Sequence, residues 1–300
     1  MNAPQTDDLP PEAALDALLA QVTVLVVTYN SGHCLPALGQ ALARLPHVIV
    51  VDNASQDDTP AQVARCLPAA RLLRLEANKG YGVANNAGLA QVATPYALLL
   101  NPDCVLTPES IGALVQAARQ WPEASVLVPQ LTDSDGSLQV NYSWPRHAWK
   151  PRTGAAEGPL AVGYACAAVM LLNMQAMAPV GFFDPRFFLY YEDEDLCLRV
   201  FQRQGQILVL PDIRVTHLSR GSVRGPRPWR SEYWRGYHHA QSKIRFMAKH
   251  QGVAAGRRAQ RRLMASAALN VLARAVLVSP KHLARAWGRL RGVWQLPPQA

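Results

Sequence analysis

Residues 22–31 read VTVLVVTYNS, an apolar and β-branched run that ends in polar side chains. The run from Val22 to Val27 predicts a buried strand, because β-branched side chains pack well in sheets and parallel sheets are covered on both faces. The polar residues from Thr28 to Ser31 then lie at its carboxyl end. Open α/β sheets bind their ligands at that edge, so this stretch predicts a strand and the rim of a site together.

The same alternation continues along the first hundred residues. Further strands are predicted at His47–Val51, Ala70–Leu75 and Ala97–Leu100, with helices at Leu35–Leu45 and Val83–Val92 between them. Polar clusters follow the strands at Asp52-Asn53, at Glu76 to Gly80 and at Asn101-Pro102-Asp103. This is the βαβαβ pattern of a nucleotide-binding, mostly parallel sheet flanked by helices, and the fold class is α/β.

Two common nucleotide-binding motifs are missing. The first strand is not followed by Gly-x-Gly-x-x-Gly, and the nearest match, Gly80-Tyr81-Gly82, has Asn85 in place of the third glycine. There is no Gly-x-x-x-x-Gly-Lys-Ser/Thr either. An NAD enzyme or a P-loop NTPase is therefore disfavoured, and a nucleotide must be bound by other means.

Charge divides the chain unequally. Residues 233–300 contain 13 Lys and Arg and no Asp or Glu, which leaves 17 basic and all 21 acidic residues before them. The formal net charge is thus near −4 for the body, residues 1–232, and near +13 for the tail, residues 233–300. This partition indicates a near-neutral body with a basic tail more than a nucleic-acid-binding protein, and we expect no nucleic-acid partner.

Within the tail, Leu263–Val278 is apolar but only 16 residues long and interrupted by Asn270 and Arg274, short of the ~20 residues that cross a bilayer. Basic residues and tryptophans flank it, which suits a helix lying on an anionic membrane. An amphipathic helix that packs on the body is an equally good interpretation. A nucleic-acid arm is a weaker third, since the aromatic residues are not interleaved with the charges.

The compartment is predicted from cysteines and the amino terminus. The five cysteines are scattered and form no Cys-x-x-Cys pair, as is typical of reduced thiols in a cytoplasmic protein. Residues 1–11 are polar and carry Asp7 and Asp8, unlike a signal peptide. We therefore expect a cytoplasmic protein, with peripheral contact to the inner membrane face as an option.

An acidic cluster, Glu192-Asp193-Glu194-Asp195, follows the aromatic run FFLYY at residues 187–191. Acidic residues in a first helical turn favour the helix dipole, so a solvated helix start is one interpretation. The apolar residues immediately before it favour a catalytic cluster instead.

Five motifs in order resemble those of the family 2 glycosyltransferases with the GT-A fold, and look most like the bacterial rhamnosyltransferase branch. The similarity covers roughly residues 21–250, and the motifs are VVTYNS (26–31), VVDNAS (50–55), NKGYG (78–82), LNPD (100–103) and YEDEDLCLR (191–199). Any one alone is weak, but five at plausible spacing are specific.

The resemblance implies a donor site and a metal site. Asp52 matches the aspartate that binds the base or ribose of a sugar nucleotide, with Thr28, Asn30, Asn53, Lys79 and Gly80 completing that half-site. Asn101-Pro102-Asp103 stands where the family has Asp-x-Asp, so Asp103 supplies the carboxylate for Mg²⁺ or Mn²⁺ and Asn101 an uncharged oxygen. His217 occupies the place from which family members bring a histidine to the metal.

Asp193 matches the family's catalytic base, which takes the acceptor's proton in a single, inverting displacement. The expected reaction is transfer of a sugar, such as rhamnose from dTDP-rhamnose, from a nucleotide-sugar donor to a glycan or lipid-linked acceptor in cell-envelope polysaccharide synthesis. The alternatives are another donor such as a UDP-sugar, or a non-catalytic carbohydrate-binding protein. A nucleotidyltransferase is less favoured, because residues 28–33 contain no Arg or Lys.

The expected organisation is a polar extension at 1–20, the glycosyltransferase domain at 21–235 and a basic amphipathic helical tail at 236–300. Pro145–Pro159 and Ser219–Trp229 are predicted loops, and Arg220 or Arg224 in the second could meet a diphosphate. The apolar stretch Gly163–Leu172 is predicted as a strand.

Overall fold

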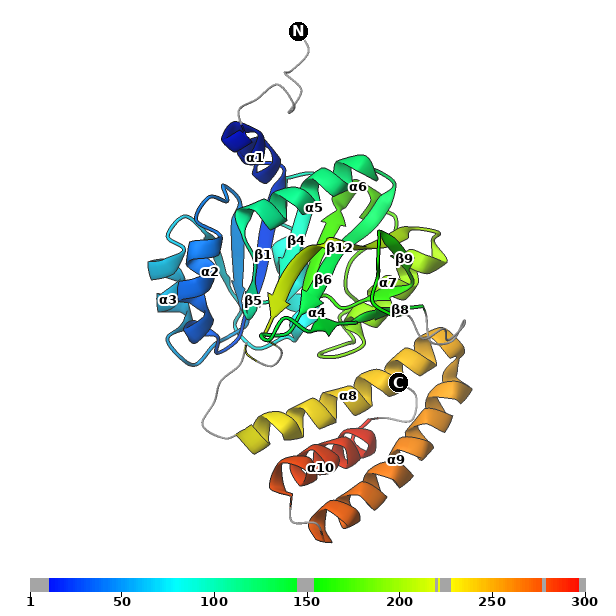
Figure 1. Ribbon diagram of the computed structural model, residues 1–300. Coiled ribbons are helices and arrows are strands. Elements are labelled where there is room, and N and C mark those ends of the chain that lie inside the picture. Colours follow the sequence, from blue (N-terminus) through cyan, green and yellow to red (C-terminus); the bar gives the residue numbers. More distant parts are fainter. Residues whose placement is uncertain (1–10, 145–153, 219–220, 222–227, 277–278, 297–300) are drawn as a thin grey trace. The chain divides into compact units, whose positions relative to one another are not determined.

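The computed structural model describes residues 11–144, 154–218, 221, 228–276 and 279–296 (Figure 1). The chain divides into two compact units. The first, here called the sheet unit, comprises Met1–Lys79, Ala84–Phe182 and Leu196–Val223. The second, the helical unit, comprises Gly80–Val83, Phe183–Asp195 and Arg224–Ala300.

The sheet unit is built on a ten-stranded sheet, with a separate pair formed by β8 and β10. Apolar runs of the sequence form its centre, and every residue of β1 and β4 is buried. The strands are β1 (Val22–Thr28), β2 (Val48–Asp52), β3 (Arg71–Arg74), β4 (Tyr96–Leu100), β5 (Cys104–Val105), β6 (Ala124–Thr132), β7 (Leu138–Gln139), β8 (Tyr142–Ser143), β9 (Leu160–Val162), β10 (Tyr164–Ala165), β11 (Val169–Asn173) and β12 (Gln206–His217).

The strand order is β3-β2-β1-β4-β11-β6-β12-β5, with β7 on β6 and β9 on β12. The first four strands are parallel, with Thr28 opposite Asp52 in the register of β1 and β2. From β4 the sheet becomes mixed, since β11 runs antiparallel to both β4 and β6, whereas β12 is parallel to β6. The carboxyl ends of β1, β2 and β4 consequently share one edge, as the sequence predicts.

Helices cover the sheet (Figure 1). Successive side chains of β1 point to opposite faces of the sheet. Val24 and Val26 join the core under α2, α3 and α5, whereas Leu25 lies against Gly88 of α4 on the other face. The helices are α1 (Pro11–Leu19), η2 (Gly32–Cys34, a 3₁₀ turn), α2 (Leu35–Ala41), α3 (Thr59–Cys66), α4 (Tyr81–Leu89), α5 (Pro108–Gln120), α6 (Met174–Met177) and α7 (Glu192–Gln202).

Two expectations from the sequence differ from the structure. The single strand expected over Gly163–Leu172 is wrong: it is divided into β10 and β11 by residues 166–168, whose Ala168 carbonyl accepts a hydrogen bond from Asn101 N–H (2.8 Å). The polar extension expected at 1–20 contains α1, which contacts α5 and whose Leu19 is fully buried in the core.

The helical unit contains three long helices, α8 (Pro228–Gln251), α9 (Val253–Val276) and α10 (Pro280–Trp294), which pack on one another (Figure 1). Their shared core is formed by Ala240, Ile244, Val293 and Leu296. The helices begin before the boundary expected at residue 236. Among the helices that the structure describes, none has the length and hydropathy needed to span a bilayer.

Candidate active site

At the carboxyl ends of β1 and β2, the carboxylate of Asp52 is fully buried. The Thr28 hydroxyl donates to its Oδ1 (3.3 Å) and the Ser55 N–H to its Oδ2 (3.2 Å). Arg74 Nε lies 4.0 Å from Oδ2. Asp52 is thus a hydrogen-bond acceptor whose carboxylate is oriented by Thr28 and Ser55.

The loops after these two strands have unusual backbone conformations. Asn30 and Ala54 have φ values of 52° and 64°, a left-handed region that residues other than glycine adopt at some cost. The Asn30 side-chain oxygen accepts from Gln56 N–H (2.8 Å), and its own N–H donates to Ser55 Oγ (2.9 Å). The two loops therefore fix each other, and such strain is concentrated at functional sites.

Asn53 joins a third loop to this pair. Its side-chain oxygen accepts from the Lys79 N–H (2.8 Å), its side-chain amide donates to Asn78 Oδ1 (3.0 Å), and its backbone N–H donates to the Thr28 carbonyl (2.8 Å). The structure thus brings together five of the residues assigned to the donor half-site: Thr28, Asn30, Asp52, Asn53 and Lys79. Among these, the Lys79 side chain is exposed.

Gly80 lies in the helical unit, beside the segment that leads to the acidic cluster. Its φ is +87°, and a Cβ at this position would lie 2.1 Å from the Phe188 carbonyl oxygen. The next residue, Tyr81, donates its N–H to the same oxygen (3.0 Å). A side chain at position 80 would separate these segments, so glycine is required here.

Asp103 and His217 are brought together by the pairing of β5 with β12, in which Cys104 lies opposite His217. His217 Nε2 is 3.8 Å from Asp103 Oδ1, and their side chains are 13% and 2% exposed. The other carboxylate oxygen, Oδ2, accepts from Gly221 N–H (2.9 Å). Because 3.8 Å is less than twice a bond of about 2.1 Å, both atoms can bind one small divalent cation.

The tautomer of His217 is set by Gln139 of β7. His217 Nδ1 is 3.2 Å from the Gln139 side-chain oxygen, which can only accept, so Nδ1 carries the proton. The amide group of Gln139 is oriented in turn by donating to the His217 carbonyl (2.9 Å) and to Asp133 (2.6 Å). When the imidazole is neutral, its lone pair is therefore on Nε2, the nitrogen that faces Asp103, as in a metal-binding histidine.

Cys104 is the third potential ligand, since its sulfur lies within 4.8 Å of the other two ligand atoms. Burial, and then the neighbouring charge of Asp103, raise the pKa of this thiol well above its ordinary value. Its Sγ–H donates to the Ala168 carbonyl (3.6 Å). A protonated thiol is a poor ligand for a hard cation, so the donor set fits Mg²⁺ or Mn²⁺ at Asp103 and His217.

The acidic cluster forms the first turn of α7. Tyr190 and Tyr191 directly before it both have positive φ, 68° and 66°. Burial, and then the charge of Asp193, raise the pKa of the Glu192 carboxyl well above its usual range. Asp193 is half-buried, and its Oδ1 accepts from Glu194 N–H (2.9 Å). The four acidic residues therefore differ in environment: Glu192 and Asp195 are buried, whereas Asp193 and Glu194 are partly accessible.

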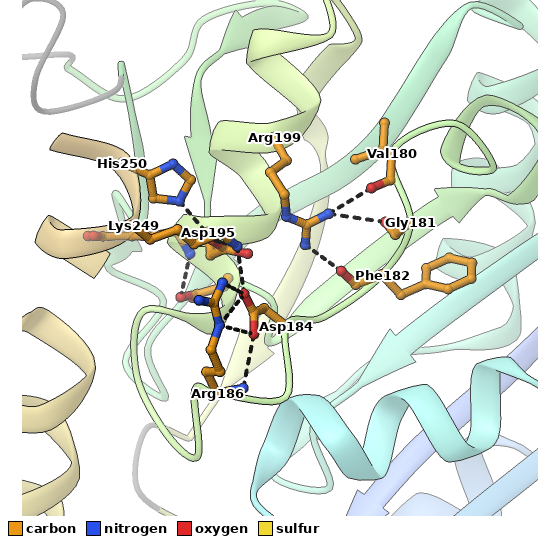
Figure 2. A network of polar contacts seen from close by, with 11 residues as sticks. Val180, Gly181, Phe182, Asp184, Arg186, Asp195, Arg199, Lys249 and His250 are labelled. Carbon is orange, nitrogen blue, oxygen red and sulfur yellow. Dashed lines mark hydrogen bonds and ion pairs between the residues drawn. The ribbon is translucent and has the colours of Figure 1, made fainter. Parts of the chain in front are cut away.

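Asp195 is held from α8 (Figure 2). Its fully buried carboxylate accepts from Lys249 and from His250 Nε2 (2.7 Å). Lys249 also pairs with Asp184 (2.7 Å). Burial alone would raise the pKa of Asp184, but hydrogen bonds from Arg186 and Lys249 outweigh it and hold that pKa well below its ordinary value. The last turn of α8 is thereby tied to the first turn of α7.

Arg199, further along α7, belongs to the sheet unit and donates to the carbonyls of Val180 (2.9 Å) and Phe182 (Figure 2). No sequence pattern indicates Gln139, Asp184, Lys249 or His250, because they lie outside every motif. Arg220 and Arg224 lie outside the described residues, as does most of the loop expected at Pro145–Pro159.

With this geometry in place, comparison with known proteins is informative. Residues 23–176 match the family described as "Glycosyl transferase family 2". An N-acetylglucosaminyl-diphospho-decaprenol L-rhamnosyltransferase of Mycobacterium tuberculosis is 32% identical over 231 residues, which are 65% of this chain and 75% of the relative.

Two solved structures share the fold at low sequence identity. The mannosyltransferase PcManGT from Pyrobaculum calidifontis, in complex with GDP-Man and Mn²⁺, has a TM-score of 0.55 at 15% identity, over 91% of this chain and 87% of that one. TarS residues 1–349 from S. aureus have a TM-score of 0.54 at 16% identity, over 90% and 91%. The GT-A fold predicted from the sequence is confirmed.

The fold and family match together define a nucleotide-sugar-dependent glycosyltransferase. More narrowly, the chain belongs to glycosyl transferase family 2, on the rhamnosyltransferase-like branch.

Proposed function

We propose that this chain transfers rhamnose from dTDP-rhamnose to a lipid-linked saccharide, with inversion at the anomeric carbon and with a divalent cation. The relative from M. tuberculosis, whose name states an L-rhamnosyl transfer to a GlcNAc-diphospho-lipid, supports the sugar and the acceptor class. The observation that carries the metal-dependent chemistry is the proximity of His217 Nε2 to Asp103, with Nδ1 of the same ring paired to Gln139.

The donor nucleotide binds at the loops after β1, β2 and β3. Asp52 accepts hydrogen bonds from the base or ribose, while Lys79 supplies a positive charge. Thr28 and Asn53 are buried and hold Asp52 and Lys79 in position. Asn30 fixes the loop between them through its two hydrogen bonds.

The metal site holds the diphosphate. Asp103 and His217 bind Mg²⁺ or Mn²⁺, and Asn101 adds a neutral oxygen. A cation there offsets the charge that develops on the leaving diphosphate. The Mn²⁺ in the PcManGT complex supports a divalent ion in this fold.

Asp193 is the general base. It takes the proton of the acceptor hydroxyl as that oxygen forms a bond to the anomeric carbon, and the bond from that carbon to the diphosphate oxygen breaks on the opposite face. The products are the inverted glycoside and the nucleoside diphosphate.

A lipid-linked acceptor places the reaction at the inner face of a membrane. The basic tail supports peripheral contact there, because residues 233–300 carry 13 positive charges and no acidic residue. The protein would then be cytoplasmic and reversibly attached to the membrane.

The test is hydrolysis and transfer with a panel of dTDP-, UDP- and GDP-sugars, each with Mg²⁺, Mn²⁺ or EDTA. We expect metal-dependent turnover of dTDP-rhamnose, lost in Asp103→Ala and His217→Ala. Asp212→Asn, at an exposed position of the same strand as His217, serves as the comparison that keeps the metal ligands.

If the protein turns over only a different nucleotide sugar, that sugar replaces rhamnose as the proposed donor. Turnover that is unchanged in EDTA would exclude the metal role. Binding of a donor without turnover under every metal condition would favour a carbohydrate-binding protein.

A further inference from the structure

The helical unit contains an apolar cavity of ≈640 Å³ where one end of each long helix meets the others. Trp229 and Tyr233 come from the start of α8, Val271 and Ala275 from the end of α9, and Leu283 and Trp287 from the start of α10. Its volume lies within the range of about 300–1,000 Å³ for pockets that bind small molecules. Trp229 and Trp287 are each about half exposed, at 51% and 49%.

The packing of the three helices differs between their two ends. Between α8 and α10, a Cβ at Gly288 would lie 2.0 Å from the Tyr233 carbonyl, and one at Gly236 2.1 Å from the Arg285 carbonyl. These two helices are therefore in backbone contact. At the opposite end, Ile244 and Val293 pack with residues of α9 in a closed core, whereas at the cavity end the aromatic side chains remain partly exposed to water.

The helices that line the cavity are strongly basic. Residues 233–300 contain 13 Lys and Arg and no Asp or Glu, and each helix has a basic residue next in sequence to a lining residue: Arg230 on α8, Arg274 on α9 and Lys281 on α10. The acidic residue of these helices, Glu232, is buried and paired with Arg235 (3.0 Å) and Arg285 (3.7 Å). The amino ends of α8 and α10 add the positive ends of two helix dipoles.

An apolar cavity between helices of high positive charge is complementary to an amphiphile that has a hydrocarbon chain and an anionic head. We propose that the cavity binds part of the polyprenyl chain of the lipid-linked acceptor. This inference rests on the acceptor class of the proposed function. It assigns α8–α10 to acceptor recognition, a task separate from the donor and metal sites.

Two acceptors test it, both carrying the same saccharide diphosphate, one esterified to a polyprenyl chain and one to a methyl group. In the unmodified protein we expect a KM for the polyprenyl acceptor that is at least about tenfold lower, because each buried CH₂ contributes to affinity. Ala284→Trp, which fills the cavity, and Trp287→Ala, which removes one wall, should abolish this preference. The kcat and KM for the methyl acceptor should not change.

Trp294→Ala is the matched control, since Trp294 is on the same helix, is 72% exposed and does not line the cavity. It should retain the chain preference. Equal KM changes for both acceptors in Ala284→Trp, or an unchanged preference in both cavity variants, would overturn the inference.

Direct binding separates this inference from the proposed function. If neither acceptor is glycosylated while donor hydrolysis persists, the proposed acceptor class fails, and binding of radiolabelled polyprenyl diphosphate then tests the cavity alone. Binding that is lost in Ala284→Trp and kept in Trp294→Ala supports it, and no binding refutes it. Trp287→Ala that changes only the oligomeric state, or only the partition onto phosphatidylglycerol vesicles, would show a second copy or a membrane lipid as the occupant instead.

Discussion

At the scale of single residues, we expect the neighbouring carboxylates in the first turn of α7 to have different roles. Asp193→Asn keeps the size and the hydrogen bond from Glu194 N–H but removes the carboxylate that we propose as the base. We expect kcat for transfer to fall by roughly 10²–10⁴-fold, the usual contribution of a general base. Donor affinity, measured by titration calorimetry, should remain unchanged.

Glu194→Gln is the control for Asp193→Asn, because Glu194 is also half-buried in the same turn. It should retain most of kcat. If kcat falls as much in Glu194→Gln as in Asp193→Asn, the total negative charge of the turn is what matters, and Asp193 is not a specific base.

Gln139 is a positioning residue for His217. Gln139→Leu removes the acceptor that holds the proton on Nδ1, and partners of this kind contribute about 10–100-fold to metal affinity. We expect Mn²⁺ affinity, measured by electron paramagnetic resonance titration, to fall by that factor. Gln206→Leu, at an exposed position of the same strand as His217, should bind Mn²⁺ normally.

His217 and Gln139 show what the sequence can and cannot predict about the site. Asp52, Asp103 and His217 are predictable because each follows an apolar run that must end at the edge of the sheet. Gln139 is not, because its position depends on how β7 pairs with β6 and not on any local pattern.

At the scale of elements, the contact between α8 and the first turn of α7 is a buried ion-pair network. Lys249→Met leaves the buried Asp195 carboxylate with one charged partner fewer. Removing one partner of a buried pair costs about 3–5 kcal/mol, so we expect a loss of unfolding free energy of roughly 3 kcal/mol in urea denaturation.

Arg44→Met offers a comparison within the same chain. Arg44 and Asp16 are also 2.7 Å apart, but their side chains are 39% and 60% exposed. Such surface pairs contribute about 0–1 kcal/mol. Similar losses in both variants would mean that burial of Asp195 is not what makes its network important.

Elements were predictable where one physical pattern dominated. Strands β1, β2 and β4 were recognisable because buried parallel strands are continuous apolar runs. The division of Gly163–Leu172 was not, since every residue there is compatible with a strand and the break is made by hydrogen bonds to Ala168 from a distant loop.

At the scale of the whole molecule, the tail gives a prediction about location. Four arginines of α9, Arg257, Arg258, Arg261 and Arg262, are exposed. Changing all four to Gln should weaken binding to phosphatidylglycerol vesicles by at least about tenfold, since each basic residue near an anionic surface contributes about 1 kcal/mol. Sedimentation of vesicles with increasing salt measures this.

Donor hydrolysis by the same variant should be unchanged, because these arginines are on the helical tail and not among the donor or metal residues. Vesicle binding equal to that of the unmodified protein would reject the membrane role. The sequence left open whether the tail lies on a membrane or packs on the body; the structure adds that its three helices pack on each other, which composition alone could not reveal.

The backbone contact between α8 and α10 has a mechanical consequence. Because the backbones of α8 and α10 are in contact at Gly236 and Gly288, one helix cannot move far along the other without breaking these contacts. The longer partner, α8, has 24 residues and is about 36 Å long, and its last turn holds Asp195 through Lys249 and His250. The paired helices are therefore a common support for the turn that carries Asp193.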